Sequence, residues 1–142
     1  MKHSPHNENN PKSNKILKVI HSNISKPYNS SINDKKYFIT FLDEYSWKVR
    51  LFTLKSKAEA PDIINDFLKY LNNQFEDHKV KIFKTDGGKE YKNKKIRRYC
   101  KDNGIEKSFS PPYCPENNGK AERINQTIKN TAKIFIILGK II

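Results

Sequence analysis

The apolar positions along this chain change their period several times, and each change predicts a different element. Residues 37–42 are almost continuously aromatic and β-branched, which predicts a short buried strand. Strand patterns also cover residues 16–24 and residues 48–55, and the second of these follows an Asp-Glu-Tyr-Ser turn. Three successive strands of this kind predict an antiparallel meander.

From residue 56 the period lengthens. Apolar side chains recur every three or four positions over residues 56–75, which predicts a helix with one apolar face. Ser56, with Glu59 three positions later, forms a capping box at its start. The remaining predicted elements are a strand at 80–85, a basic helix at 92–102 that ends at Asn103-Gly104, a strand at 105–109 and a helix at 120–138. This order predicts an α/β fold with a five-stranded mixed sheet and helices on its faces.

The same pattern divides the chain into three parts. Residues 1–15 are polar and are expected to form a flexible leader. Residues 16–138 hold the periodic segments and form one domain, and residues 139–142 form an apolar tail. A chain of 142 residues has room for one domain of ordinary size.

Charge narrows the choice of partners. Lys and Arg number 28 against 15 Asp and Glu, a formal charge of +13, which favours polyanions, with nucleic acid ahead of anionic membranes. The longest apolar run, at residues 134–138, is far shorter than the roughly 20 residues of a membrane-spanning helix. There is no pattern of a secretory signal, and Cys100 and Cys114 lack metal-ligand spacing, so both are expected to be free thiols. We therefore expect a nuclear or cytoplasmic protein that is neither secreted nor embedded in a membrane.

Acidic residues are scarce, so their positions are informative. Asp86 follows a predicted strand at a Gly-Gly turn, and Glu122 opens the last predicted helix, with 35 residues between them. Two carboxylates placed in this way supply the hard oxygen ligands that Mg²⁺ prefers. On spacing alone, a solvated turn aspartate and a glutamate favoured by the helix dipole explain the pattern better than a metal site does.

Three longer segments carry a resemblance that changes this balance. They are YFITFLDEYSWKVRLFTLKSK, KTDGGKEY and NGIEKSFSPPYCPENNGKAERINQTIKN. Together they resemble the catalytic core of retrotransposon integrases of the Copia and Ty1 type, over about residues 16–130. The resemblance implies a ribonuclease-H-like fold in which three carboxylates of a D, D-35-E signature bind two Mg²⁺ (or Mn²⁺) ions that act on DNA phosphodiesters. It makes Asp86 the second acid and Glu122 the third.

The first acid of that signature is missing. The family carries His, then Ser or Thr, then Asp on its opening strand, whereas this chain has Asn23 after His21 and Ser22. An amide oxygen is neutral, and two Mg²⁺ ions about 4 Å apart repel each other strongly. We therefore expect weakened metal binding and little or no catalysis, as in a truncated or degenerate copy of a polyprotein segment.

Two other acids, Asp43 and Glu44, could in principle replace the missing one. They lie at the far end of the second predicted strand, and a hairpin there is expected to direct them away from the position of Asn23. We expect no rescue from them.

The resemblance also implies residues that contact DNA. Tyr113 and Asn118 match family loop positions that approach the DNA end. Gln126 and Lys129 follow Glu122 by four and seven residues, so a helix would present all three on one face. An ordinary solvated lysine explains Lys129 equally well.

A dense basic cluster forms a further candidate surface. It comprises Lys92, Lys94, Lys95, Arg97 and Arg98, with Tyr99 beside it. Such a cluster can bind phosphates nonspecifically, and it is also typical of a solvated helix face.

Two functions stay open on this sequence. The first is DNA integration, that is, DNA end processing and strand transfer by Mg²⁺-dependent phosphoryl transfer, impaired at Asn23. The second is a noncatalytic nucleic-acid-binding module on the same scaffold. A true ribonuclease H is disfavoured because the PYCPENNGKAER segment resembles integrases. An apolar tail left exposed would favour homo-oligomers.

Overall fold

The computed structural model describes residues 14–25, 37–109, 123, 124, 126, 127 and 130. Its strands are β1 (Val19–Ser25), β2 (Tyr37–Asp43), β3 (Val49–Leu54), β4 (Ile82–Thr85) and β5 (Glu106–Phe109). Its helices are the 3₁₀ turns η1 (Lys57–Glu59) and η2 (Lys89–Lys92) and the α-helices α2 (Ala60–Asn72) and α3 (Lys94–Asp102). Residues 1–13 of the predicted leader and the predicted tail at 139–142 lie outside the described residues.

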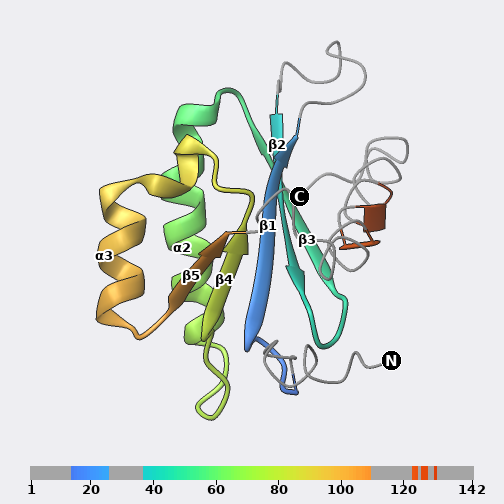
Figure 1. The fold of residues 1–142 in the computed structure, drawn as a ribbon, viewed down its shortest axis with the longest axis vertical. Helices are drawn as coiled ribbons and strands as arrows, with labels where there is room; N and C mark the ends of the chain where they lie inside the picture. Colours follow the sequence, from blue (N-terminus) through green and yellow to red (C-terminus); the bar gives the residue numbers. More distant parts are fainter. Residues whose placement is uncertain (1–13, 26–36, 110–122, 125, 128–129, 131–142) are drawn as a thin grey trace, which may run out of the picture.

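The five strands form one mixed sheet, as predicted. Their order across the sheet is β3-β2-β1-β4-β5, with β1 in the centre (Figure 1). The β1–β2 and β2–β3 pairs are antiparallel, which gives the predicted meander. The β1–β4 and β4–β5 pairs are parallel; α2 connects β3 to β4, and α3 connects β4 to β5.

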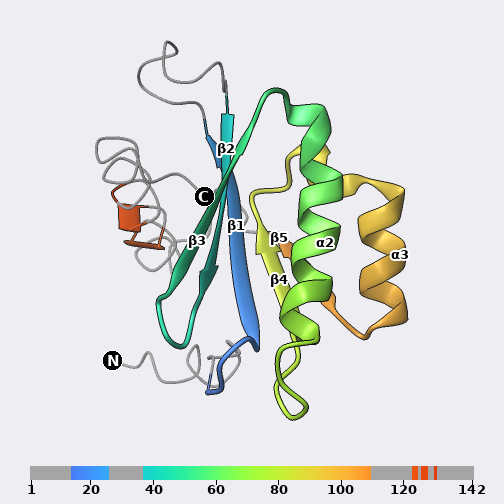
Figure 2. The same cartoon turned by 180° about the vertical axis from the view of Figure 1, so that it is seen from behind.

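Helices cover both faces of this sheet. Helices α2 and α3 lie together on one face, while the helical residues near Ile124 lie on the other (Figures 1 and 2). Successive side chains of β2 point to opposite faces of the sheet, so the strand contributes to the packing on both sides. Phe41 packs in the core under α2, and Leu42 packs with Ile124 on the opposite face. Strand β2 is therefore buried at every position after Tyr37.

The main core lies between the sheet and the two α-helices. Helix α2 contributes Ile64, Phe67 and Leu68, and α3 contributes Ile96 and Cys100. These α2 positions carry the three- and four-residue spacing seen in the sequence, so the predicted apolar face of the helix is confirmed.

Local signals set the helix boundaries. The predicted capping box is present: the Glu59 carboxylate accepts the Ser56 backbone N–H at 3.2 Å, and the chain passes through η1 before α2 begins. Helix α3 starts two residues later than predicted because the Asn93 side chain caps it, accepting the Lys95 backbone N–H at 2.8 Å. It ends just before Gly104, whose φ of +66° suits glycine.

Two strands begin later than their apolar patterns predict. Strand β1 starts at Val19 because Leu17 adopts a left-handed φ of +68° and donates its backbone N–H to Asp43. Strand β4 starts at Ile82 because the Val80 N–H bonds the Asn72 side chain instead of a neighbouring strand. In both places a contact distant in sequence overrides the local pattern.

Two class-level expectations can be checked in the described part of the chain. Cys100 is a free, buried thiol, and burial raises its pKa; Cys114 lies outside the described residues. None of the described helices is both long and apolar enough to cross a bilayer.

One buried hydrogen bond ties the segment after β4 to the central strand. The Tyr91 hydroxyl in η2 lies 2.9 Å from the Ser22 hydroxyl in β1, and Tyr91 is only 1% exposed. Burial raises the pKa of the Tyr91 phenol far above its usual value, and the negative charges of Asp86 and Glu90 act in the same direction. The folded chain therefore keeps this proton at a pH where an unfolded chain loses it.

This contact predicts a pH-dependent stability difference for Tyr91→Phe. At pH 7.5 the variant should lose about 1 kcal/mol of unfolding free energy, because the Ser22 hydroxyl loses its partner. Above about pH 10 the raised pKa makes the wild type lose up to about 1.4 kcal/mol per pH unit through Tyr91, so the deficit should shrink. Urea unfolding between pH 7.5 and pH 11 measures both effects.

Tyr70→Phe is the matched control, because it removes a hydroxyl from a side chain that is 46% exposed. Its unfolding free energy should stay within about 0.5 kcal/mol of the wild type. A Tyr91→Phe deficit that stays constant up to pH 11 would contradict the buried, protonated phenol.

Candidate active site at the β1–β4 pair

The parallel β1–β4 pair determines where the candidate site lies. Its register aligns Val19 with Ile82 and His21 with Lys84. Asn23 lies two residues beyond the last of these pairs in β1, and Asp86 follows directly after the end of β4 at Thr85. Asn23 is on the sheet face that carries Leu42 and Ile124, because it is two residues from His21, whose cross-strand partner is Leu42. The convergence of Asn23, Asp86 and Glu122 stays a prediction, because Glu122 lies outside the described residues.

Asp86 is held by the turn that follows β4. Its Oδ1 accepts the Gly88 backbone N–H at 3.0 Å, while the residue as a whole is exposed. Gly87 has a φ of +83°, a conformation that glycine and asparagine adopt most readily. Glycine at position 87 therefore suits this turn, in which Oδ1 of Asp86 is bound to the Gly88 N–H.

Asn23 lies near the end of β1 and is partly exposed. The backbone carbonyl oxygen of Asn23 accepts a hydrogen bond from the Thr40 hydroxyl at 3.3 Å, which ties this part of β1 to β2. An amide at this position offers an oxygen ligand without charge, where an aspartate would offer a negative one.

Glu90 and Tyr91 lie in the TDGGKEY segment, yet sequence reasoning gave neither a role. A Cβ added to Gly88 would lie 2.9 Å from Glu90 Oε1 and 3.3 Å from Asp86 Oδ1, so both carboxylates flank this glycine. Lys57 lies 3.9 Å from the other oxygen of Glu90. Tyr91 anchors the same segment to β1 through Ser22, a contact across 69 residues that no local pattern reveals.

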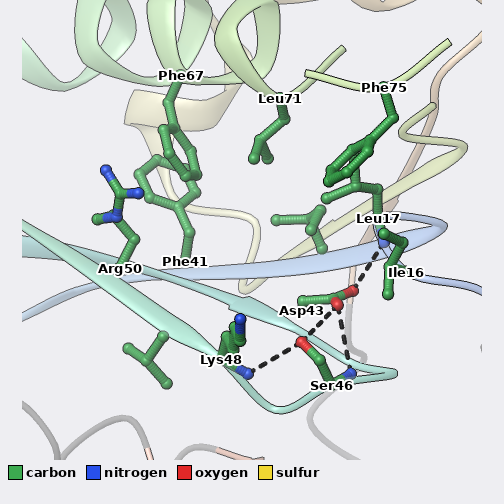
Figure 3. Close-up of a pocket in the computed structure, with 12 residues that line it drawn as sticks. Ile16, Leu17, Phe41, Asp43, Ser46, Lys48, Arg50, Phe67, Leu71 and Phe75 are labelled. Atoms are coloured by element: carbon green, nitrogen blue, oxygen red, sulfur yellow. Dashed lines mark hydrogen bonds between the residues drawn. The ribbon is translucent and has the colours of Figure 1, made fainter. Parts of the chain in front are cut away.

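Asp43 cannot replace the missing acid, as expected. Its partner in β1 is Ile20, three residues before Asn23, so the two positions are about 10 Å apart along the strand. Its carboxylate accepts the Leu17 backbone N–H at 3.0 Å and the Ser46 hydroxyl at 2.7 Å (Figure 3). It lines a pocket of about 290 Å³ between β2, β3 and α2, on the opposite face of the sheet from Asn23.

Glu44 is also engaged elsewhere. Its Oε1 lies 2.6 Å from His21 Nε2, and both side chains are largely buried, at 4% and 13% exposed. Its backbone N–H bonds the Val19 carbonyl at the start of β1. The Glu44 carboxylate is therefore paired with His21, which lies two residues before Asn23 on the same strand.

Only one of the predicted DNA-contact residues can be located. Gln126 is helical and exposed, and its amide donates to Asn130 at 3.0 Å along the same helix. The others lie outside the described residues, as does the third acid: Tyr113, Asn118, Glu122 and Lys129.

The described residues can be tested against the metal cluster that the resemblance implies. In the part of the chain that the structure describes, no group of three or more His, Cys, Asp or Glu side chains could hold a metal ion. Of the residues that the resemblance assigns to this cluster, the structure describes one carboxylate, Asp86, and one neutral amide, Asn23; Glu90 adds a second carboxylate beside Gly88. Asp86 and Asn23 provide oxygen ligands of the type that Mg²⁺ accepts, but their single negative charge does not fit two divalent cations.

Retrotransposon polyproteins contain segments similar to this chain. It is 30% identical over 127 residues to the retrovirus-related Pol polyprotein from transposon TNT 1-94 of Nicotiana tabacum, and this covers 89% of the chain and 10% of the relative. It is 29% identical over 115 residues to the truncated transposon Ty1-A Gag-Pol polyprotein of Saccharomyces cerevisiae, covering 79% and 10%. The chain thus spans about a tenth of the length of these relatives.

Solved retroviral integrases share the fold. The HTLV-2 integrase catalytic core domain, solved in complex with magnesium in a trimeric form, matches with a TM-score of 0.57 at 18% identity, covering 85% of this chain and 72% of that one. The catalytic core domain of BIV integrase matches with a TM-score of 0.55 at 17% identity, covering 78% and 65%. These likenesses establish the ribonuclease-H-like fold.

A family model covers most of the folded region. The model for the integrase core domain matches residues 18–115, which include all five strands, both α-helices, Asn23 and Asp86. The chain therefore belongs to the integrase core domain family, within the branch found in Ty1/Copia-type retrotransposon polyproteins.

Proposed function

We propose that this chain is the catalytic-core segment of a retrotransposon integrase whose DNA-joining chemistry is impaired at Asn23. The observation that carries the proposal is the family match over residues 18–115, which includes Asn23 where the resemblance implies the first acid. The proposed substrates are element ends and target DNA, reached in the nucleus or cytoplasm. Association with further copies of the chain is part of the proposal.

The chain's own groups have separate proposed roles. Asp86, fixed by its bond to the Gly88 N–H, holds one oxygen toward the DNA phosphate region. Glu122 completes the acidic set, and Tyr113, Asn118, Gln126 and Lys129 orient the DNA end. A divalent metal, where bound, supplies the charge that stabilises a displaced phosphate oxygen. Asn23 contributes only an uncharged oxygen, so it does not balance the positive charge of the metal.

The second candidate is a nucleic-acid-binding module without catalysis. The neutral side chain at position 23 favours it, because the scaffold, the turn at Asp86 and the positive charge are all retained. The two candidates differ in one measurable respect: only the first predicts that a carboxylate at position 23 restores chemistry.

Restoring the carboxylate is the direct test. Asn23→Asp should tighten Mn²⁺ binding and raise strand transfer on a DNA end by at least about a hundredfold over the unmodified chain, because the site regains a negative charge beside Asp86. Isothermal titration with Mn²⁺ measures the first effect, and a strand-transfer assay with Mg²⁺ or Mn²⁺ measures the second.

Gln74→Glu is the matched control, because it adds the same charge at an exposed position after α2. It should change neither readout. Equal activity of the unmodified chain and Asn23→Asp would refute the impairment, and a silent Asn23→Asp variant that still folds and binds DNA would favour the noncatalytic module.

Asp86 can be tested in the restored background. Adding Asp86→Asn to Asn23→Asp should cut strand transfer by at least about a hundredfold, since it removes a charge but keeps the shape of the turn. Its unfolding temperature should stay close to that of Asn23→Asp, because Asp86 is exposed. Undiminished strand transfer in the double variant would remove Asp86 from the proposed site.

A further inference from the structure

The outer face of α3 is almost entirely cationic. Its exposed side chains are Lys94, Lys95, Arg97, Arg98, Lys101 and Asp102. Between them lies an open hollow of about 520 Å³ lined by these six residues alone. The apolar residues of the helix, Ile96 and Cys100, point the other way into the core. Helix α3 forms one flank of the molecule, on the side away from the helical residues around Ile124 (Figures 1 and 2).

This arrangement does not stabilise the helix. The first turn of α3 holds Lys94 and Lys95 and no acidic residue, although the positive end of the helix dipole favours acids there. Lys94 precedes Arg97 by three residues and Arg98 by four. Lys101 follows Arg98 by three residues and Arg97 by four. Like charges at these spacings repel across the helix surface. Folding stability therefore does not explain the composition of this face.

The protein's own acids neutralise little of this charge. Asp62 accepts from Lys95 at 3.2 Å, but both side chains are 68% exposed, so water and salt screen the pair. Among the described residues, Lys94, Arg98 and Lys101 take part in no ion pair. Nearby Lys107 has a pKa below its usual value, first because it is partly buried and also because Arg97 and Lys92 repel its charge.

We propose that the exposed face of α3 is a second nucleic-acid-binding surface, one that contacts the phosphate backbone of a duplex. Lys94 and Lys101 are about 10 Å apart along the helix axis. About three successive phosphates of one DNA strand occupy the same axial length. The two arginines between them reach phosphate oxygens with paired N–H donors.

A duplex fits this surface better than a membrane or a peptide does. Amphipathic helices that bind membranes expose apolar side chains beside their cations, whereas Ile96 and Cys100 are buried in the core. Peptide recognition by a helix depends on apolar anchors in a groove, and the hollow on α3 has no apolar residue in its lining. Nucleic acid supplies a regular array of charges that a convex cationic helix can follow.

The surface is independent of the proposed chemistry. Helix α3 begins seven residues after the Gly-Gly turn, so it lies near Asp86 in the chain, but none of its cations is a candidate metal ligand. Binding measured in EDTA therefore tests α3 whether or not the Asn23–Asp86 site works. A failure of strand transfer leaves this proposal standing, and a failure of binding leaves the site proposal standing.

Neutralising the centre of the face is the test. In the full chain, the triple variant Lys94→Gln, Arg98→Gln, Lys101→Gln should bind a mixed-sequence 30-base-pair DNA duplex at least about tenfold more weakly at 0.1 M salt. The slope of log K against log salt should fall in magnitude by about 2 to 3, because about 0.9 counterions are released per phosphate contact. Fluorescence anisotropy in EDTA between 50 and 200 mM salt measures both.

The matched control removes three exposed lysines elsewhere: Lys48→Gln, Lys55→Gln, Lys81→Gln. Its affinity should fall by less than about threefold, which separates a local surface from overall charge. The α3 variant should melt no lower than the wild type, because it relieves repulsion on the helix. Equal losses of affinity in the two triple variants would overturn the proposal. So would unchanged DNA binding of the α3 variant with weakened binding to phosphatidylserine vesicles.

Discussion

The parallel pairing of β1 with β4 is the constraint on which the rest of this structure depends. It joins the N-terminal meander to the helical half of the chain, and it sets the ends of β1 and β4, which carry Asn23 and precede Asp86, on neighbouring strands. After the meander the chain has to cross from the edge strand β3 to the far side of β1, and it does so through η1, α2 and the segment up to Ile82. The apolar face of α2 makes that crossover favourable by covering Phe41 and Phe83 in the core. Core packing and site geometry therefore have one common origin.

Charge decides what such a site can hold. At an effective dielectric constant of about 20, two unit charges 4 Å apart interact by about 4 kcal/mol, so two doubly charged ions at that distance repel about four times as strongly. Carboxylates offset this repulsion, whereas the amide of Asn23 does not. The nearby acids do not offset it either, because Asp43 stabilises the start of β1 and Glu44 pairs with His21. In the proposed site, a single atom change, from a carboxylate oxygen to an amide nitrogen, removes one charge from the cluster while the integrase-core fold is retained.

The sequence predicted most of the fold because its signals are local. The strand patterns, the Ser56–Glu59 capping box and the stop before Gly104 all act within a few residues. The errors arose where distant contacts decide: the late start of β1 depends on Leu17 bonding Asp43, 26 positions away. The roles of Asp86 and Asn23 rest on motif resemblance and stay predictions, while the Tyr91–Ser22 bond was missed because hydroxyl pairing leaves no periodic signal. The information that local sequence patterns lacked was which residues distant in the chain contact one another.

Positive charge and catalytic charge follow opposite requirements in this molecule. A polyanion partner is attracted by unpaired cations, and those on α3 remain exposed at a cost to the helix. A metal cluster needs concentrated negative charge, and the described acids that follow β4, Asp86 and Glu90, lie outside α3. Substitutions of these acids therefore leave the cations of α3 unchanged. Of the two activities proposed for this chain, binding of a phosphate backbone and phosphoryl transfer, each is lost through different substitutions.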